Sequence, residues 1–392
     1  MITLGHLANC RERRNNMHDR TNTGREAELI TTAKRLEEVV TELLALEAVA
    51  VDTEFFWERT FYPILGLVQL ASSDGSCWLV DAVSIKDLQA LGPVMASTTV
   101  TKVLHDAPQD LSILARATGA MPQNIFDTRL ASGFAGFGST CSLQNLLREV
   151  LGIELSKAET RSNWVHRPLS ANQLRYAADD VLHLLTLRER LQVACANDTV
   201  RGWLAEELTR LDDPAIYQER EPRLMYLRIK GSFRLRAEEL AVLRELAAWR
   251  EEEARQRDWP RGHILPDNLL VTLAQRKPCD LAALIGIPDM PRNMPADVTA
   301  TLLAAITRGR SIDEADCPRP ADEGVSKHNI KSRYERVSAH INSVCATHHI
   351  DPALVGSRAE IESVLQHLAQ GAPDNPPLAT SWRHTLITEA LR

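Results

Sequence analysis

The stretch that decides the fold is "VAVDTEFFWERTFYPILGLVQLA", residues 49–71. An apolar run over residues 48–51 leads directly into Asp52 and Glu54, so two acids stand where a buried strand is expected. Residues two apart in a strand face the same side, about 6.6 Å apart along the chain. Two ionised carboxylates placed in this way repel each other, and in a partly buried setting they must bind a proton or a cation. The alternative is a strand that ends in water, where an acidic pair needs no partner.

Strand-like and helix-like segments alternate from residue 25 to residue 213. The segment "RLEEVVTELLAL" has helical periodicity, whereas "AVAVDTEF", "ILGLVQLAS" and "SCWLVDAV" have the composition of strands. This alternation predicts an α/β layer fold built on a mixed sheet. From about residue 160 to residue 210 the pattern becomes helical.

The remainder of the chain has only helical periodicity. Residues 234–313 contain amphipathic segments separated by short loops with Pro and Gly, which predicts a small helical bundle. Residues 314–330 are rich in Pro and charge and are interpreted as a linker, and residues 331–392 are expected to form a second, smaller bundle. Residues 1–24 contain arginines but no apolar core of a secretory signal. We interpret them as a disordered leader, or as the result of a start codon assigned too early with Met17 as the alternative, and an organelle transit peptide is a weaker alternative.

Composition narrows the class of protein. A chain of 392 residues with 44% hydrophobic and 25% charged residues is expected to be a soluble protein of two or three domains. The net charge of -7 argues against a uniformly basic nucleic-acid-binding surface, although a local basic patch remains possible. Seven scattered cysteines predict reduced thiols and a cytoplasmic location. No apolar run reaches about 18 residues, so no membrane association is expected.

Two further segments supply acids that could join Asp52 and Glu54. In "KVLHDAPQDLSILAR" a helix is predicted to begin near a proline, with Asp110 in its first turn. In "LRYAADDVLHLLTLRERL" Tyr176 and Asp180 are four apart and therefore share one helix face. Each has a plainer alternative: Asp110 could complement a helix dipole, Tyr176 could be a packing residue, and Asp180 could be a surface acid. Their neighbours Asp106 and Asp179 are expected to be turn or surface acids.

Taken together and in order, "DTEF", "HDAPQDL" and "YAADD" make the chain resemble the DnaQ-like 3′→5′ exonucleases with a tyrosine in the third motif. Within them it closely resembles the ribonuclease D family, also through "FYPILGLVQLA" and "LSKAETRSNWVHRPLSANQLRYAADDV". The tail resembles the helicase-and-ribonuclease-D C-terminal (HRDC) domain, clearly over 234–313 and loosely over 331–392. The resemblance implies a ribonuclease-H-like, mixed-sheet exonuclease domain over 25–213, followed by two small all-α helical bundles.

The resemblance also implies which residues carry the reaction. Asp52, Glu54, Asp110 and Asp180 would hold two divalent cations, Mg²⁺ or Mn²⁺, and Tyr176 would orient the attacking water. Phosphodiester hydrolysis needs a hydroxide at neutral pH and stabilisation of charge on the leaving oxygen, and two cations about 3.5–4 Å apart supply both. Carboxylate oxygens are the ligands that such hard cations prefer.

Candidate substrate-binding residues are less sharply defined. Phe55 could contact a terminal base, and Lys157, Arg161 and Trp164 could contact phosphate or base, although packing is an equally good explanation for both aromatic residues. The stretch "EREPRLMYLRIKGSFRLR", residues 219–236, has six basic and two acidic residues interleaved with aromatic ones. It is either a surface that contacts single-stranded nucleic acid or a solvated linker. We interpret His105 as a structural or supporting residue.

The predicted function is that of a 3′→5′ exoribonuclease that trims the 3′ ends of precursor tRNAs and releases 5′-mononucleotides. Its substrate class follows from the resemblance alone, and no obligate protein partner is evident. One alternative is a 3′→5′ exonuclease acting on single-stranded DNA, because the acids would serve it equally well. The other is a catalytically silent RNA-binding scaffold. The complete set of acids argues against the scaffold, because acids that repel each other cost stability unless they bind a metal.

Overall fold

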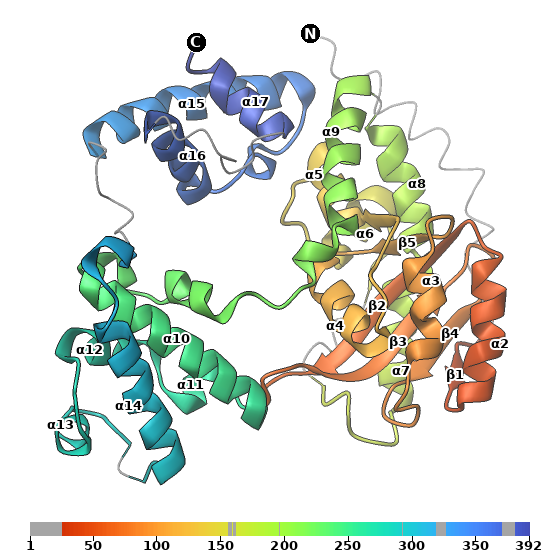
Figure 1. Ribbon diagram of the computed structural model, residues 1–392. Helices are drawn as coiled ribbons and strands as arrows, with labels where there is room; N and C mark the ends of the chain where they lie inside the picture. The colour runs from red at the N-terminus through yellow and green to blue at the C-terminus, as the bar shows by residue number, and fades with distance from the viewer. Residues whose placement is uncertain are drawn as a thin grey trace. The chain divides into compact units, whose positions relative to one another are not determined.

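The computed structural model describes residues 26–155, 159, 162–195, 197–291, 293–318, 327–370 and 381–392 (Figure 1). The predicted leader, residues 1–24, and residues 319–326 of the predicted linker lie outside this part of the chain. By its internal contacts the chain divides into two compact units. The first runs to Glu54 and resumes over Leu65–Asp212, and the second comprises Phe55–Ile64 and Asp213–Arg392.

The first unit is built on a six-stranded mixed sheet with the strand order β1-β4-β3-β2-β5-β6. Strands β1 and β4, β2 and β5, and β5 and β6 pair in parallel, whereas β3 and β4 are antiparallel. The sheet is mixed, as the alternating sequence pattern predicts. The strands are β1 Glu28–Ile30, β2 Ala48–Phe56, β3 Ile64–Ala71, β4 Cys77–Asp81, β5 Thr101–Leu104 and β6 Ile125–Asp127.

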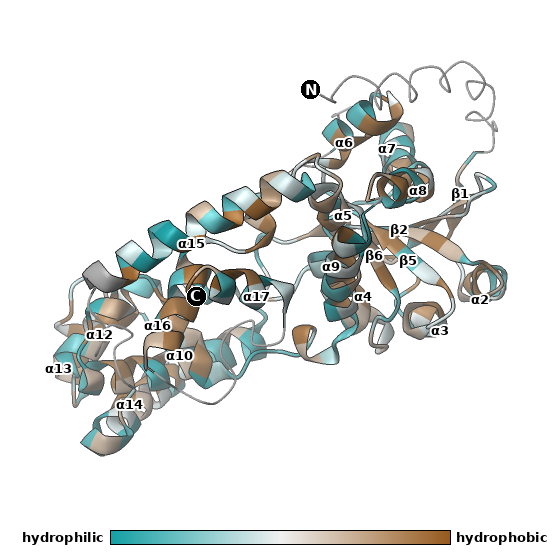
Figure 2. Cartoon of the chain, turned by 90° about the horizontal axis from the view of Figure 1, so that it is seen from above, coloured by the Kyte–Doolittle hydropathy of each residue, from teal (hydrophilic) through white to brown (hydrophobic). Residues whose placement is uncertain are grey.

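Helices cover both faces of this sheet. Figure 2 shows α2, α3 and α4 on one side of the strands and α6, α7 and α8 on the other. Helix α2 also shows how the sequence places such a helix: Thr32 caps its first turn, and its apolar positions lie on one buried face. The helices are α2 Ala33–Leu44, α3 Gly92–Ala96, α4 Pro108–Thr118, α5 Thr128–Phe134, α6 Leu143–Leu151, α7 Ala171–Leu182, α8 Leu184–Ala194 and α9 Asp198–Thr209, with short 3₁₀ turns η2 Gln89–Leu91 and η3 Arg210–Asp212.

Strand β2 is one of the two central strands of the sheet and carries the first two acids. Val49, Ala50 and Val51 are completely buried, and the strand is in register with β5 through Ala48–Thr101 and Ala50–Val103 pairs. The apolar half of β2 therefore anchors the strand in the core. Its other half continues towards the edge of the core, where Asp52 and Glu54 are only half-buried.

The second unit is helical. Its long helix α10 packs along α14, α12 and the 3₁₀ helix η5 around an apolar core that includes Leu243, Leu270 and Leu302. Gly309 permits α14 to pack closely against α10, because a Cβ at this position would lie 2.5 Å from the Cα of Val242. The elements are η4 Pro214–Ile216, η5 Pro222–Arg228, η6 Ser232–Arg234, α10 Ala237–Arg257, α11 Arg261–Ile264, α12 Asp267–Arg276, α13 Leu281–Ile285, α14 Ala296–Arg310, η7 Glu314–Asp316, α15 Lys327–His348, η8 Pro352–Leu354, α16 Arg358–Gln370 and α17 Trp382–Glu389.

Helices α15, α16 and α17 pack on one another through buried residues such as Val337, Val364 and Ile387. Their separation from the preceding helices as a second bundle over 331–392 remains a proposal. Within the described residues, no helix is both long enough and apolar enough to cross a membrane. The cysteines of the described part of the chain are all unpaired, which agrees with the expectation of reduced thiols.

The sequence did not indicate that the loop after β2 belongs to the second unit. The carboxylate of Asp258, directly after α10, accepts hydrogen bonds from the backbone N–H groups of Phe61 (2.9 Å) and Tyr62 (3.2 Å). The Arg261 guanidinium lies 4.4 Å from the centroid of the Phe61 ring, and it is held there by the buried carboxylate of Glu251. These contacts explain why residues 55–64 are grouped with the helices rather than with the sheet.

Candidate active site

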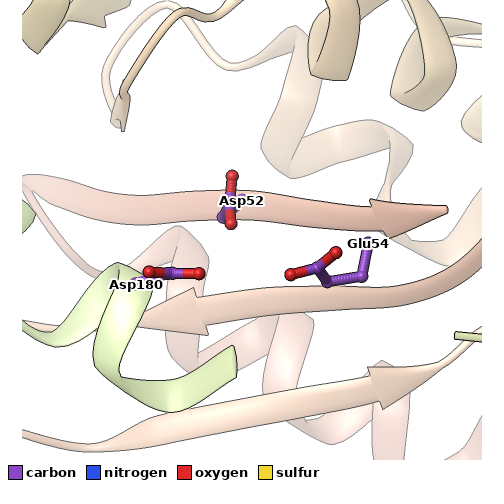
Figure 3. Close-up of side chains that lie close together, drawn as sticks. All are labelled: Asp52, Glu54 and Asp180. Atoms are coloured by element: carbon purple, nitrogen blue, oxygen red, sulfur yellow. The ribbon is translucent and has the colours of Figure 1, made fainter. Parts of the chain in front are cut away.

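Three carboxylates from two elements meet beside β2. Each of Asp52, Glu54 and Asp180 offers an oxygen, and these oxygens lie within 4.8 Å of one another. Figure 3 shows Asp52 and Glu54 on the strand, with Asp180 reaching towards them from α7. The alternation of the strand places the first pair on one face, as the sequence predicts.

Helix α7 is positioned so that its polar face meets the strand. It begins with a capping box in which the Ser170 side chain and the Gln173 side chain each bond the other's backbone. Ala177, Ala178 and Val181 are its buried apolar residues. The start of the helix and its apolar face therefore fix the direction in which Asp180 points.

The fourth predicted acid, Asp110, is close by but is not a member of this group of three. It lies in the first turn of α4, as predicted, and its side chain is buried. Its carboxylate accepts a hydrogen bond from the hydroxyl of Thr53, the residue between the two acids of β2. Asp110 nevertheless raises the pKa of Asp52 and Glu54 through charge repulsion, so its electrostatic coupling to the site is direct.

Burial raises the pKa of every acid at the site, and repulsion from neighbouring acids raises it further. Burial, followed by repulsion from the other three acids, raises the pKa of Asp52 well above its ordinary value. Burial and repulsion from Asp180 and Asp110 raise the pKa of Glu54 to about 9. Burial raises the pKa of Asp180 to about 7 and that of Asp110 to about 6. Without a cation the group therefore holds protons at neutral pH.

Tyr176 is hydrogen-bonded to one of these acids. A hydrogen bond from its side chain lowers the pKa of Asp180, in opposition to burial and to repulsion by Asp179. The Tyr176 ring also packs near Trp164, with ring centroids 6.1 Å apart and planes inclined by 39°. Tyr176 is therefore both packed and chemically connected to the group of acids.

The turn that presents Asp110 is held by a residue that the sequence analysis missed. The carboxylate of Asp127 accepts hydrogen bonds from the backbone N–H groups of Asp106 and Ala107, both at 3.0 Å, while it also caps the start of α5. Asp106 itself adopts a left-handed conformation with φ of 64° and pairs with Arg129. The signal available in the sequence was an Asp-Thr pair at a strand end, which is typical of a helix N-cap.

His105 also supports this turn. Its Nδ1 lies 3.0 Å from the Thr128 hydroxyl, and its Nε2 lies 3.1 Å from the backbone oxygen of Cys141. Burial lowers the pKa of His105 to about 4, so the ring is neutral at physiological pH. Both ring nitrogens are engaged within the protein, which agrees with the structural or supporting role expected for this residue.

Arg167 holds the segment that precedes α7. It forms a bidentate pair with the buried carboxylate of Asp81, at 2.8 and 2.6 Å, and donates to the backbone oxygens of Gly66 and Trp164, both at 2.8 Å. Gly66 is required for this packing, because a Cβ there would lie 2.8 Å from the backbone carbonyl carbon of Trp164. The arginine thereby ties the approach to α7 to β3 and β4. Nothing in the sequence pattern singled it out.

The structure describes two of the four candidate substrate-binding residues. Phe55 is half-buried on β2 directly after Glu54. Trp164 is only 1% exposed and packs near Tyr176, and this position favours packing over substrate contact. Lys157 and Arg161 lie outside the described residues.

Asp179 is not the solvated neighbour that the helix geometry predicted. It is half-buried, and burial raises its pKa. Burial, followed by the charge of Asp179, raises the pKa of the Cys77 thiol on β4, so Asp179 faces that strand. The interpretation as a surface acid is therefore wrong, because α7 packs against β4 along this side.

The donor set fits hard divalent cations. It consists of carboxylates alone, half-buried and with raised pKa values, and a cation among them would remove the repulsion that raises those values. A site for a softer metal would instead offer sulfur or imidazole ligands. The fit rests on Asp52, Glu54 and Asp180, with Asp110 close enough to interact electrostatically.

Comparison with known proteins extends these observations. A family model described as 3′-5′ exonuclease matches residues 27–195, and a model described as HRDC domain matches residues 239–306. A ribonuclease D of Desulfotalea psychrophila is 38% identical over 371 residues, which cover 93% of this chain and 97% of that protein. A ribonuclease D of Escherichia coli is 30% identical over 373 residues, with 93% and 97% covered.

The structural comparison agrees. The crystal structure of Escherichia coli RNase D, described as an exoribonuclease involved in structured RNA processing, superposes with a TM-score of 0.82. The sequence identity in this superposition is 30%, and it covers 94% of this chain and 98% of that chain. The likeness therefore extends over both units and over the whole length of the relative.

Proposed function

This chain belongs to the ribonuclease D family and is a hydrolytic 3′→5′ exoribonuclease, and we propose that it trims the 3′ ends of precursor tRNAs and releases 5′-mononucleotides. The observation that supports the proposal most strongly is the convergence of Asp52, Glu54 and Asp180 beside β2. The likeness to a relative described as acting in structured RNA processing supports the choice of substrate class.

We further propose that Asp52, Glu54, Asp110 and Asp180 hold two divalent cations, Mg²⁺ or Mn²⁺. Such cations, when bound, supply a hydroxide at neutral pH and stabilise the charge that develops on the leaving oxygen. The protein's own contribution is to fix the carboxylates through the buried half of β2, the capped start of α7 and the Asp127-bonded turn before α4. One oxygen of the Asp110 carboxylate accepts the hydrogen bond from Thr53, and its other oxygen is left to contact a cation.

Tyr176 is proposed to orient the attacking water. A phenol with an ordinary pKa of about 10 keeps its proton at neutral pH and is a poor base. Its hydrogen bond to Asp180 directs the hydroxyl towards the group of acids, where it can hold a water in line with the scissile phosphate. Packing beside Trp164 restricts the ring to this position.

The absence of disulfide bonds among the described cysteines supports the cytoplasmic location that we propose for this activity. In the described part of the chain the cysteines are unpaired, and several of them are buried. RNA is the proposed macromolecular partner.

The test of the proposal is cleavage of a 5′-labelled precursor tRNA that carries a 3′ extension, with Mg²⁺ and with EDTA. We expect progressive shortening from the 3′ end with release of 5′-mononucleotides, and no cleavage in EDTA. Asp52→Asn should reduce the rate by about 100-fold or more, since even residues that only support metal ligands cost 10- to 100-fold. Glu37→Gln, an exposed acid on α2, is the matched control and should retain activity.

A parallel assay with single-stranded DNA of the same sequence addresses the nearest alternative. A clear preference for DNA would contradict the proposed substrate class. Retained cleavage by Asp52→Asn would contradict the assignment of the site.

A further inference from the structure

One face of the second unit combines exposed apolar and basic side chains in a way that the active site does not explain. We define the basic–aromatic segment as residues 223–236, which span η5, η6 and the turns between them. It contains five basic residues and no acidic one, within a chain whose net charge is -7. Figure 1 shows this stretch leading into α10.

The segment is a fixed part of the helical unit. Met225, Ile229 and Leu235 point into the apolar core around α10 and are at most 8% exposed. Successive turns are closed by backbone hydrogen bonds, such as that from Ser232 N–H to Ile229 O (3.2 Å) and that from Leu235 N–H to Ser232 O (3.0 Å). The chain between these anchors is therefore held in one conformation, and the intervening side chains project outward.

The outward side chains include large apolar groups. Phe233 is 65% exposed, Leu227 is 63% exposed and Leu224 is 54% exposed. Side chains three apart in a 3₁₀ helix lie one above the other, so Leu224 and Leu227 form one ridge on η5. A single exposed apolar residue is ordinary on a protein surface, but several on a short ordered segment indicate a contact surface.

The cations of the segment divide into two kinds. Arg223 and Arg236 pair with the carboxylates of Glu245 and Glu239 within the same unit. Arg228, Lys230 and Arg234 are exposed and have no ion pair among the described residues. The Arg234 guanidinium lies 5.2 Å from the centroid of the Phe233 ring, so an exposed ring and a cation are already arranged together.

We propose that the basic–aromatic segment is a contact surface for single-stranded RNA. A base stacks on the exposed ring of Phe233, and the RNA phosphates on either side lie against Arg228, Lys230 and Arg234. Exposed aromatic rings and unpaired cations are the two features by which proteins bind single strands without reading their sequence. The inference rests on the proposed function only in naming RNA as the ligand.

The surface is tested by equilibrium binding of a fluorescein-labelled single-stranded RNA to the full chain carrying Asp52→Asn, followed by fluorescence anisotropy. In this background Phe233→Ala should weaken binding by about 5- to 100-fold, the range that one base stack contributes. Phe233→Leu should weaken it as well, because leucine keeps the apolar surface but lacks the ring face. Trp259→Ala removes another exposed aromatic residue of the same unit and should leave the affinity unchanged.

The charge contribution is read from the salt dependence. Lys230→Gln should reduce the slope of log K against log salt concentration by about 0.7, the value for one phosphate contact with a single strand. Phe233→Ala should leave that slope unchanged, because stacking releases no counterions. Lys331→Gln, an exposed lysine on α15, should alter neither the affinity nor the slope.

The result that overturns the proposal is wild-type RNA affinity in Phe233→Ala together with an unchanged slope in Lys230→Gln. A membrane contact is tested with vesicles of phosphatidylcholine and phosphatidylglycerol. If Phe233→Ala lowers vesicle binding and leaves RNA binding unchanged, the surface serves lipid and the proposal is wrong. Cleavage by the chain without the Asp52→Asn change is measured separately, so loss of the proposed activity cannot be confused with loss of this surface.

Discussion

Replacing Asp180 by Asn should stabilise the metal-free protein at pH 8 while it abolishes RNA cleavage. The carboxylate is half-buried, its oxygen lies within 4.8 Å of those of Asp52 and Glu54, and burial raises its pKa to about 7. At pH 8 the folded protein must therefore carry an unfavourable charge at this position. Asparagine has nearly the same shape, accepts the hydrogen bond from Tyr176 and carries no charge.

The sign and size of the effect follow from proton linkage. Because the pKa is higher in the folded protein than the ordinary 3.8, the folded state holds the proton more tightly, and stability falls as the pH rises from about 4 through about 7. The rise in the pKa of Asp180 from 3.8 to about 7 corresponds to a loss of at most about 4 kcal/mol in the free energy of unfolding. Salt and partial exposure screen the repulsion, so we expect a gain of about 1–3 kcal/mol at pH 8.

The assay is thermal unfolding in EDTA at pH 8 and pH 4, followed by circular dichroism. The midpoint of the variant should exceed that of the wild type by about 2–10 °C at pH 8, and the difference should shrink towards zero at pH 4. Addition of Mg²⁺ should then stabilise the wild type more than the variant, because a bound ligand stabilises only the state that binds it. The control variant Glu37→Gln should have the same unfolding midpoint as the wild type at both pH values. Equal gains at both pH values, or no gain at pH 8, would refute the reasoning.

Three other substitutions test the supports of the site. Thr53→Val removes the hydroxyl that donates to the Asp110 carboxylate, which should raise the pKa of that acid further. Mn²⁺ affinity measured by calorimetry should therefore fall at pH 6 and recover at pH 8. Arg167→Lys breaks the bidentate pair with buried Asp81 and should lower the free energy of unfolding in urea by about 2–4 kcal/mol; wild-type stability would contradict this role. Gly66→Ala places a Cβ 2.8 Å from a backbone carbonyl carbon and should cost more than about 2 kcal/mol in the same assay. By contrast, Gly262→Ala, with open space around the position, should cost nothing.

Much of the site could be predicted because it depends on local periodicity. The two-residue period of a strand puts Asp52 and Glu54 on one face of β2, whatever the rest of the chain does. The four-residue spacing along a helix likewise puts Tyr176 and Asp180 on one face of α7. The apolar run before Asp52 likewise predicts a buried strand, and β2 is one of the two central strands of the sheet.

The parts that could not be predicted depend on which neighbour a side chain finds in the folded protein. Asp110 repels Asp52 and Glu54 electrostatically, but the hydrogen bond that its carboxylate accepts from Thr53 is a contact that sequence spacing does not determine. Asp179 was expected in solvent, because helix geometry gives its direction but does not show that β4 packs against this side of α7. The attachment of residues 55–64 to the helical unit depends on Asp258, which lies almost 200 positions further along the chain.

The most direct test of the central claim is binding of Mn²⁺ to the purified chain, measured by isothermal titration calorimetry at pH 7.5 alongside RNA cleavage. The wild type should bind two ions per chain and release protons on binding, because the acids hold protons when no cation is present. Asp52→Asn and Asp180→Asn should each lose at least one of the bound ions together with cleavage. Full Mn²⁺ binding by both variants, or cleavage by the wild type in EDTA, would contradict the account.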